Sequence, residues 1–409
     1  MERFVRAPGP HGGAPALDGG PPEWRGPTLP GTLLFNLTGG LASFGIIFYA
    51  RDVFHASAAQ IGWLVAMPQL AYLASCLFFP PLFGLLLARH YLIVATDGTA
   101  LLLAGLLAGR SLPSVFVLFG LSDFLIALFW PPLMGWLARG LDEDALGRTL
   151  RNYNLTWSSS HIVSPYAAGL LLERGSSLPL WAAAALSALA CLYIWAASLA
   201  LPRIRADRER EPTGRQHLQA PDRSTPLRFA GWVGQVAGYL LMGMLASIFP
   251  LFLRDRLGFS ESRVGLLLLV RAFFSTAGFW LLGRTSFWHF RPLPMILGQA
   301  GLAVLTLSLA FPRSFLPLAL ILAPLGSLTA LSYNESLFHG VSGSSRRAAR
   351  MAINEAARTV GFVVGASGGG LLLQHSSFSR VLVIAATAIL ATTAVQVLLA
   401  YRPPFRSSW

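Results

Sequence analysis

Apolar residues recur along this chain in long runs that are separated by short polar segments rich in arginine. Each run holds roughly 20 residues, which is the length an α-helix needs to cross a bilayer core about 30 Å thick. The pattern therefore predicts an all-α membrane protein with twelve transmembrane helices. The predicted spans are 31–51, 60–82, 91–109, 113–138, 152–172, 179–201, 229–253, 262–283, 292–311, 314–339, 350–373 and 380–401.

A basic stretch at 202–228 divides the twelve segments six and six. Residues 31–201 and 229–402 are therefore expected to form two six-helix bundles joined by a polar linker. Residues 1–30 are rich in glycine and proline and lack the apolar core of a signal peptide, so they are predicted to be a disordered cytoplasmic tail. Residues 403–409 form a second short tail.

Composition supports a membrane protein and argues against several other classes. Hydrophobic residues make up 54% of the chain and charged residues 12%, against about 25% charged in soluble domains. The formal net charge is +13 and every basic residue is arginine, a coding bias that does not require a nucleic-acid partner. Cys76 and Cys191 both lie in apolar runs and the eight histidines are scattered, so neither a metal site nor a cofactor is expected.

The distribution of arginine predicts the topology. If the N-terminus is cytoplasmic, 21 arginines fall on the cytoplasmic side and 8 on the other, and Arg271 and Arg358 lie within spans. Cytoplasmic loops of membrane proteins carry such an excess of basic residues. The chain is therefore expected to be a multi-pass protein of the cytoplasmic (inner) membrane, with both termini in the cytoplasm.

The two halves contain a weak internal repeat. Residues 48–67 align without a gap with 251–270, and 169–172 align with 370–373 as Gly-Leu-Leu-Leu. The repeat indicates a duplication, and chance similarity between apolar sequences is the alternative. The four charged residues of the repeat are expected at the outer ends of the first and seventh helices, as a gate or as stops at the lipid headgroups. The matching positions are Arg51 with Arg254, Asp52 with Asp255, Ser57 with Ser260, Gly62 with Gly265 and Leu64 with Leu267.

Six plus six helices, a central linker and parallel halves together resemble the major facilitator superfamily over residues 31–402. Members of that family carry a Gly-x-x-x-Asp-Arg-x-Gly-Arg-Arg type motif between the second and third helices. This chain keeps the glycine and one basic residue of the motif, Gly84 and Arg89, but lacks the acidic residue. Residues 164–169 (Ser-Pro-Tyr-Ala-Ala-Gly) resemble a degraded Gly-Pro-x-x-Gly-Gly antiporter motif, in which Pro165 can kink the helix. Two further stretches, at 130–132 and 152–157, are similar to bacterial members of the superfamily. The resemblance implies that the first, fourth, seventh and tenth helices line a central path.

Ionisable side chains inside the spans are the candidates for chemistry, since each is costly in hydrocarbon unless it is paired or wetted. An acid at this depth can carry a proton if burial favours its neutral form, and a histidine can shuttle protons near neutral pH. The alternative for each is a structural role in holding helices together. The proton-coupling candidates are Asp123, which lies nearest the midplane, Glu335, Glu355 and His161.

The remaining polar and aromatic residues of the spans are candidates for binding a solute. Arg271 could hold a carboxylate or phosphate through its planar guanidinium, or could pair with Asp123 or Glu335. Asp97 lies on a peripheral helix and is expected to be structural. The substrate-binding candidates are Gln69, Trp130, Asn154, Trp157, Tyr239, Arg271, Asn334, Asn354 and Arg358.

The function that these features favour is secondary active transport of a small organic solute by alternating access, with protons as the coupling ion. A receptor or scaffold that uses the same fold without transporting is the alternative. The expected partners are a small-molecule substrate, the lipid bilayer and protons, and the expected state is a monomer. No set of nucleophile, base and orienting group is present in the sequence pattern, so an enzyme is not expected.

Overall fold

The computed structural model describes residues 28–79, 86, 88–133, 143–200, 225–344 and 347–401. Within these ranges the chain forms twelve long helices. They are α1 (Thr28–Phe54), α2 (Ala58–Phe78), α3 (Ala88–Ala108), α4 (Leu112–Ile126), α6 (Glu143–Leu172), α7 (Leu178–Ala200), α8 (Leu227–Asp255), α9 (Glu261–Leu282), α10 (Pro292–Ser308), α11 (Phe315–Val341), α12 (Arg347–His375) and α13 (Phe378–Tyr401).

Each predicted span corresponds to one of these helices, and the largest difference lies in the fourth span. The sequence predicts a continuous helix over 113–138, but α4 ends at Ile126 and a turn covers 127–129 before a short helical segment at 130–133. Pro131 and Pro132 cause the break, because neither has an N–H to donate and each ring clashes with the carbonyl four residues earlier. The turn instead makes short-range bonds such as Phe129 N to Ile126 O at 3.0 Å.

Two other boundaries differ from the prediction. Helix α6 begins at Glu143, nine residues before the predicted start. Helix α1 begins at Thr28, within the predicted tail. The rest of both predicted tails, most of the linker and Gly84 lie outside the described residues.

The outer surface of the helices is apolar, as a lipid-facing surface should be. Nine helices of the described ranges are long and apolar enough to cross a membrane, and α10 is a shorter apolar helix. Large apolar side chains remain exposed on many of them, including Leu101 at 66%, Leu199 at 70% and Phe311 at 74%. A soluble protein rarely exposes this much contiguous apolar surface, so the chain is a multi-pass membrane protein.

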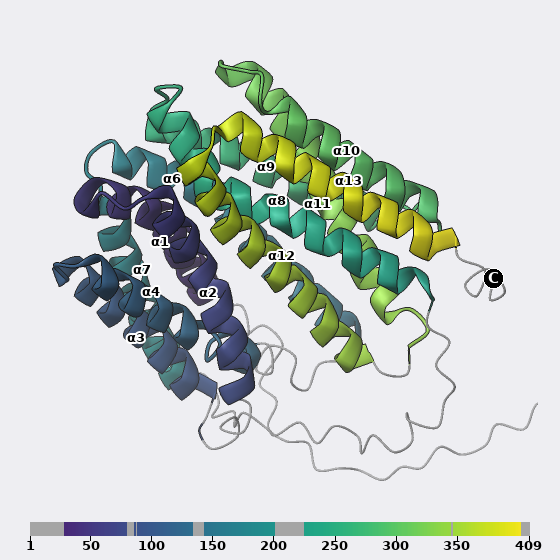
Figure 1. Cartoon of the computed structure of the whole chain (residues 1–409). Coiled ribbons are helices and arrows are strands. Elements are labelled where there is room, and N and C mark those ends of the chain that lie inside the picture. The colour runs from purple at the N-terminus through teal and green to yellow at the C-terminus, as the bar shows by residue number, and fades with distance from the viewer. Residues whose placement is uncertain are drawn as a thin grey trace, which may run out of the picture.

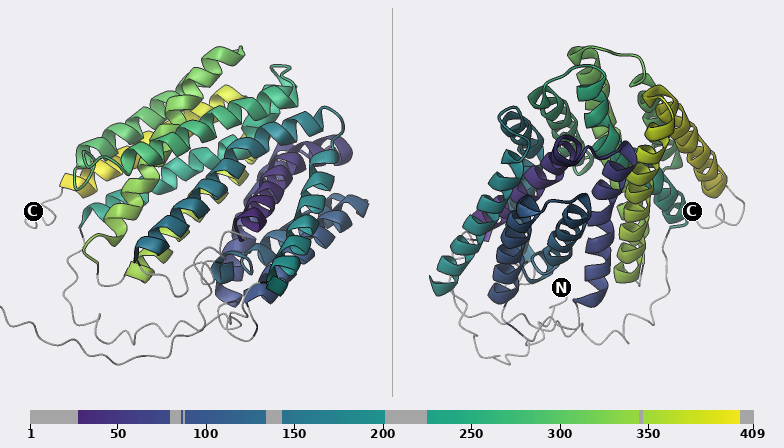
Figure 2. Two further views of the ribbon diagram at one scale, coloured as in Figure 1. Left: turned by 180° about the vertical axis from the view of Figure 1, so that it is seen from behind. Right: turned by 60° about the vertical axis from the view of Figure 1, so that its left-hand side comes forward.

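The helices form two groups, one before and one after the linker (Figure 1). In the first group α7 packs on α1 and α3, and α4 packs on α2 and α3. In the second, α8 packs on α11, α12 and α13, and α10 packs on α13. Helix α7 ends and helix α8 begins at the same end of the bundle (Figure 2). We call this end the linker end. The opposite end carries the α1–α2 and α8–α9 loops, and we call it the ion-pair end.

The two groups meet chiefly along two helix pairs, α2 with α12 and α6 with α9. Glycines allow both contacts. A Cβ on Gly62 would collide with the backbone of Ala366 and Gly370, and a Cβ on Gly265 would collide with the backbone of Pro165. Backbones can approach this closely only where a side chain is missing. The interface between the halves is therefore tightest near the ion-pair end of these four helices.

The glycine contacts connect directly to the internal repeat. Gly62 and Gly265 are matching positions of the repeat, and so are Gly169 and Gly370. Gly62 contacts Gly370 in the α2–α12 pair, and Gly169 contacts Glu261 and the next residue of α9. The α2–α12 crossing thus contains Gly62 and Gly370, and the α6–α9 crossing contains their counterparts Gly265 and Gly169. The repeat marks equivalent surfaces with which the two halves contact each other.

Candidate functional site

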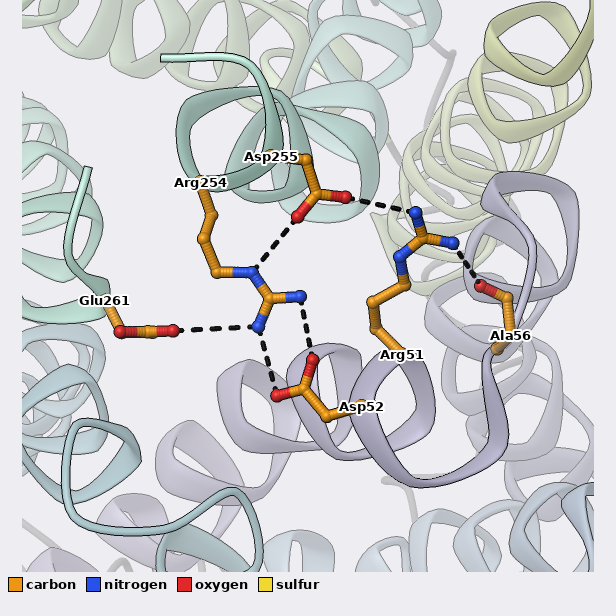
Figure 3. Close-up of polar contacts among 6 residues, drawn as sticks. All are labelled: Arg51, Asp52, Ala56, Arg254, Asp255 and Glu261. Atoms are coloured by element: carbon orange, nitrogen blue, oxygen red, sulfur yellow. Dashed lines mark hydrogen bonds and ion pairs between the residues drawn. The ribbon is translucent and has the colours of Figure 1, made fainter. Parts of the chain in front are cut away.

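Four charged residues link the halves at the ion-pair end. Arg51 Nη2 lies 3.2 Å from Asp255 Oδ2, and Arg254 Nη2 lies 2.8 Å from Asp52 Oδ1. Each half thus supplies one arginine and one aspartate, and each arginine pairs with the aspartate of the opposite half (Figure 3). The structure places these four predicted gate residues together at one end of the bundle, in a reciprocal arrangement.

Arg254 is the centre of this ion-pair cluster. Its Nε also bonds Asp255 Oδ1 at 3.1 Å, and its Nη1 lies 3.6 Å from Glu261 Oε1. Its guanidinium stacks over the ring of Phe48, 4.8 Å from the centroid. Its side chain is 17% exposed, against 40% for Arg51. Arg254 therefore neutralises three carboxylates, whereas Arg51 pairs with one and otherwise donates to the carbonyl of Ala56.

The loops that follow the paired residues share a backbone conformation. His55 and Gly258, which are equivalent in the repeat, both have positive φ angles of 51° and 68°. The following residues, Ala56 and Phe259, donate their N–H groups to carbonyls six residues earlier. A residue in the left-handed region directly after the last turn is a common way to end a helix. Gly258 adopts it without strain, and His55 is one of the residue types that tolerate it.

A second contact at this end joins Glu173, in the turn after α6, to the first turn of α9. The N–H of Ser262 donates to Glu173 Oε1 at 3.3 Å. Ser260, the N-cap residue of α9, makes no cap bond with its own side chain, whereas the equivalent Ser57 forms a full capping box with Gln60. Glu173 thus replaces the missing cap from the other half. Hydrogen bonds from Ser262 and Ser260 lower the pKa of its carboxyl.

A polar cluster lies between the halves near the middle of the helices. Arg358 on α12 pairs through Nε with Glu355 Oε2 at 2.7 Å, one turn earlier on the same helix. Its Nη1 donates across the interface to Gln69 Oε1 on α2 at 3.3 Å. The ring of Tyr239 on α8 lies 5.7 Å from the Arg358 guanidinium, and Tyr333 on α11 lies 6.3 Å from Tyr239. Four predicted site residues, with Tyr333, therefore meet here.

Arg271 lies at the middle of α9, in the second of the two helix pairs that join the halves. Its side chain is half-buried, and its Nε is buried without a hydrogen-bond partner. Among the described residues, its hydrogen bond runs from Nη1 to the Sδ of Met242 at 3.1 Å. The predicted pair with Asp123 or Glu335 is wrong for this structure, because none of the ion pairs between described residues includes Arg271.

The predicted residues of α6 face Arg271 across the second helix pair. His161 is exposed and stacks on Trp157, with ring centroids 4.4 Å apart. The contacts of Gly169 with Glu261 and of Gly265 with Pro165 set an antiparallel register, which puts His161 and Trp157 at about the depth of Arg271. Tyr239 lies three residues, about one helical turn, before Met242, the residue whose sulfur accepts from Arg271.

Asp123 stands near the middle of the fourth span, on α4. Its side chain is half-buried, and no hydrogen bond or ion pair to it is found within the described part of the chain. The deep basic side chains, Arg271 and Arg358, make their contacts elsewhere. An acid at this depth without a cation is unusual, because an ionised carboxylate in hydrocarbon is costly.

Two predicted site residues lie instead inside the second group of helices. Glu335 is 2% exposed and its Oε1 is buried without a partner. Asn354 is 1% exposed and accepts a hydrogen bond from Ser336 at 2.6 Å. Its carbonyl accepts from Gln235 Nε2 at 3.3 Å. Asn354 is therefore bonded inside the second group in this structure, and Glu335 shares neither surface nor partner with Glu355.

The other predicted residues lie apart from both clusters. Trp130 packs against Phe35, Phe129 and Tyr153 inside the first group, so it is part of an aromatic core. Asn154 is exposed on α6, and Asn334 is half-buried on α11. Asp97 was expected to be structural, but its side chain is exposed on α3.

Several residues that matter for these contacts escaped the sequence analysis. Glu173 and Glu261 lie in polar turns, where an acid is ordinarily solvated, so only the approach of the other half gives them partners. Met242 is apolar and carried no signal as an acceptor for Arg271. Gln235 did carry a signal, because an amide in the middle of an apolar span must find a partner.

The sequence of this chain also matches a known protein family. Residues 28–331 match the profile of the Major Facilitator Superfamily, which is more than half of the chain. The chain belongs to the major facilitator superfamily. This membership confirms the resemblance and indicates a multi-pass membrane transporter rather than an enzyme. No curated protein matches the chain.

Solved structures of transporters share the superfamily fold with the chain. An autoinhibited peptide transporter of the POT family has a TM-score of 0.75 at 12% identity, and the match covers 93% of this chain and 99% of that one. A bacterial homologue of the iron transporter ferroportin in an inward-facing state scores 0.71 at 15% identity, covering 93% and 99%. The nucleoside transporter NupG scores 0.68 at 15% identity, covering 94% and 98%. At such identities the likeness shows the fold alone.

Proposed function

We propose that this member of the superfamily is a secondary transporter that moves a small organic solute by alternating access. The observation that carries the proposal is the reciprocal ion pairing of Arg51 with Asp255 and of Arg254 with Asp52 between the halves. Exposed ion pairs are individually weak, about 0.2–1 kcal/mol each. Contacts of this strength can break and form again during a transport cycle, as a gate requires.

The distribution of contacts along the helices supports one closed end. The ion pairs, the Glu173 contact and the glycine crossings all lie toward the ion-pair end. Toward the linker end, α6 exposes Asn154 and Trp157, and α12 exposes Ile353. The polar residues Arg271 and Arg358 lie between these regions. This arrangement suits a state in which the solute site communicates with the linker end.

Proton coupling is the second part of the proposal. Asp123 is our first candidate for the proton carrier because its carboxyl lies near the middle of the membrane without a basic partner among the described residues. Glu355 is the less suitable candidate, since its Oε2 is held by Arg358 at 2.7 Å. Glu335 is buried away from the interface. We therefore place the coupling step at Asp123 and a positioning role at Glu355.

The topology and assembly remain part of the proposal. The linker end is cytoplasmic, the ion-pair end faces the opposite side of the inner membrane, and the helices make twelve crossings. Residues 31–201 and 229–402 act as the two moving bundles of a monomer. Reporter fusions in the linker near Thr213 and after Trp409 should both indicate the cytoplasm. A signal from the opposite side at either position would contradict this orientation.

Transport is tested with the purified chain reconstituted into sealed liposomes. A library of small organic acids, amines, sugars and nucleosides is first ranked by the shift in thermal unfolding temperature of the protein. Radiolabelled forms of the best-binding compounds are then followed into liposomes with and without a pH gradient. A transporter should accumulate at least one compound in a gradient-dependent manner, whereas a receptor or scaffold would bind a compound and accumulate none.

Asp123→Asn separates coupling from solute movement. The variant should lose gradient-driven accumulation but keep part of the exchange of labelled for unlabelled solute, because exchange needs no net change in protonation. Thermal unfolding must show that the variant is folded. Wild-type rates of driven accumulation in Asp123→Asn would remove this residue from the coupling step.

A further inference from the structure

The two deep arginines differ in what neutralises them. Arg358 has a carboxylate at 2.7 Å from Glu355, an amide oxygen from Gln69 and the ring of Tyr239 nearby. Arg271 has a thioether sulfur as its hydrogen-bond acceptor, and sulfur in a thioether is a weak acceptor. Its Nε has no partner at all within the described part of the chain. Of the two, Arg271 is therefore the one without an anionic partner among the described residues.

A guanidinium in this position lacks the anion that normally accompanies a buried cation. A charge removed from water without a partner is strongly unfavourable, and arginines within membrane segments generally pair or face water. Arg271 lies six residues beyond Gly265, about 9 Å along α9 at 1.5 Å per residue, on the linker side of the tight α6–α9 crossing. A molecule entering from the linker end can therefore supply the missing anion.

The neighbouring side chains indicate the rest of the molecule. Across the α6–α9 pair, His161 and Trp157 stack on each other and remain exposed, Trp157 at 40%. On α8, Tyr239 lies about one helical turn before Met242, the residue whose sulfur accepts from Arg271. Planar rings beside a cation suit a ligand in which an acidic group is attached to a flat apolar body.

We propose that the transported solute is an organic monocarboxylate, bound through its carboxylate by Arg271 and through a planar body by Trp157 and His161. The proposal rests on the transport function above and names its substrate class. A guanidinium binds a carboxylate through two parallel N–H···O bonds. A phosphate monoester carries up to two negative charges and fits less well. Its second charge would need a second cation, and Arg358 is already neutralised by Glu355.

The test measures binding to the purified full-length protein by the shift in its unfolding temperature. Benzoate is the probe, with benzamide as the neutral compound of the same shape and phenyl phosphate as the dianionic one. Benzoate should bind at least about tenfold more tightly than benzamide, since a hydrogen bond to a charged group contributes roughly that much. Equal binding of benzoate and benzamide, or tighter binding of phenyl phosphate than of benzoate, would overturn the monocarboxylate assignment.

Variants then assign the site. Arg271→Gln should weaken benzoate binding about tenfold or more and leave benzamide binding unchanged. Arg271→Lys keeps the charge but loses the planar fork, so it should show an intermediate loss and also serves if Arg271→Gln does not fold. Arg256→Gln changes an exposed arginine in the α8–α9 loop and should bind benzoate as the wild type does. Wild-type benzoate affinity in Arg271→Lys and Arg271→Gln would place the anion elsewhere.

Failure of this inference can be told apart from failure of the transport function. If the liposomes accumulate a neutral compound and Arg271→Gln accumulates it at the wild-type rate, transport stands and the monocarboxylate proposal is overturned. If benzoate binds in an Arg271-dependent way but no compound is ever accumulated, the anion site stands and the transport function is contradicted.

Discussion

Replacing Arg254 should open the ion-pair end more than replacing its partner Asp52. Asp52→Asn removes one cross-half ion pair and leaves Arg254 bonded to Asp255 and near Glu261. Arg254→Gln removes the same pair and also leaves three carboxylates close together without their shared cation. The two substitutions break one interaction in common, so the difference between them measures the repulsion among the acids together with the lost stacking of Arg254 on Phe48.

The magnitudes follow from the exposure of the side chains. Arg254 is 17% exposed and Asp52 is 40% exposed, so their ion pair belongs near the upper end of the range for exposed pairs, about 1 kcal/mol. Asp52→Asn should then shift the equilibrium between closed and open ends about fivefold. Repulsion among three acids adds a similar amount, so Arg254→Gln should shift it by about 2 kcal/mol, or roughly 30-fold.

Spin labels report the equilibrium as a distance distribution. Arg110 in the α3–α4 loop and Ser314 before α11 are exposed and lie at the ion-pair end, one in each half, and labels are attached there after Cys76 and Cys191 are replaced by serine. The population with the longer distance should grow from wild type to Asp52→Asn and further to Arg254→Gln. It should also grow in wild type at 1 M salt, where the Debye length falls to about 3 Å.

Two variants serve as controls for this experiment. Arg51→Gln removes a pair whose members are 40% and 32% exposed, so its effect should be smaller than that of Arg254→Gln. Arg256→Gln alters an exposed arginine of the same loop and should change nothing. Equal open populations in Asp52→Asn and Arg254→Gln would refute the role of Arg254 as the shared cation, and unchanged distances in both would refute the gate.

Three further predictions concern other contacts. Gly62→Ala should lower the unfolding temperature, because the new Cβ would meet the α12 backbone. Gly368→Ala should raise stability by about 0.5–1 kcal/mol, because nothing lies within 4 Å of the new Cβ. A Gly62→Ala protein more stable than Gly368→Ala would contradict the tight α2–α12 crossing. Hydrogen bonds lower the pKa of the Glu173 carboxyl in the closed state. The stabilisation of the closed end by Glu173 is therefore complete above the ordinary glutamate pKa, and it is lost as the pH falls through the lowered pKa of the closed state. Glu173→Gln should abolish that pH dependence of the label distances, and its persistence would exclude Glu173. Glu355→Gln should destabilise the protein by about 1–2 kcal/mol in thermal unfolding, whereas Glu335→Gln, which removes a buried carboxyl that has no cation, should not.

The sequence by itself was sufficient for the helices and their family. Runs of about 20 apolar residues require helices, because a backbone in hydrocarbon must satisfy its own hydrogen bonds. The short polar interruptions then fix where each helix ends. The sequence fell short where a local conflict mattered. Pro131 and Pro132 lie in an apolar run that hydrophobicity reads as continuous, but their rings break the helix at 127–129.

The repeat was visible in the sequence, but its meaning was not. Matching letters at Gly62 and Gly265, or at Arg51 and Arg254, indicate a duplication without saying what the positions contact. The structure shows that these residues meet the opposite half. Such contacts join residues about 200 positions apart, and no periodicity along the chain encodes them.

The deep charges show most clearly what only the tertiary structure decided. Glu355 and Arg358 are three residues apart, so helix geometry alone brings them to one face and their pairing was foreseeable. Arg271, Asp123 and Glu335 have no such local partner, and the sequence left open whether they pair with one another. The packing of the helices separates them and leaves Arg271 with a thioether sulfur. Whether a buried charge is satisfied depends on which helix faces it and at what depth, and those are properties of the assembled bundle.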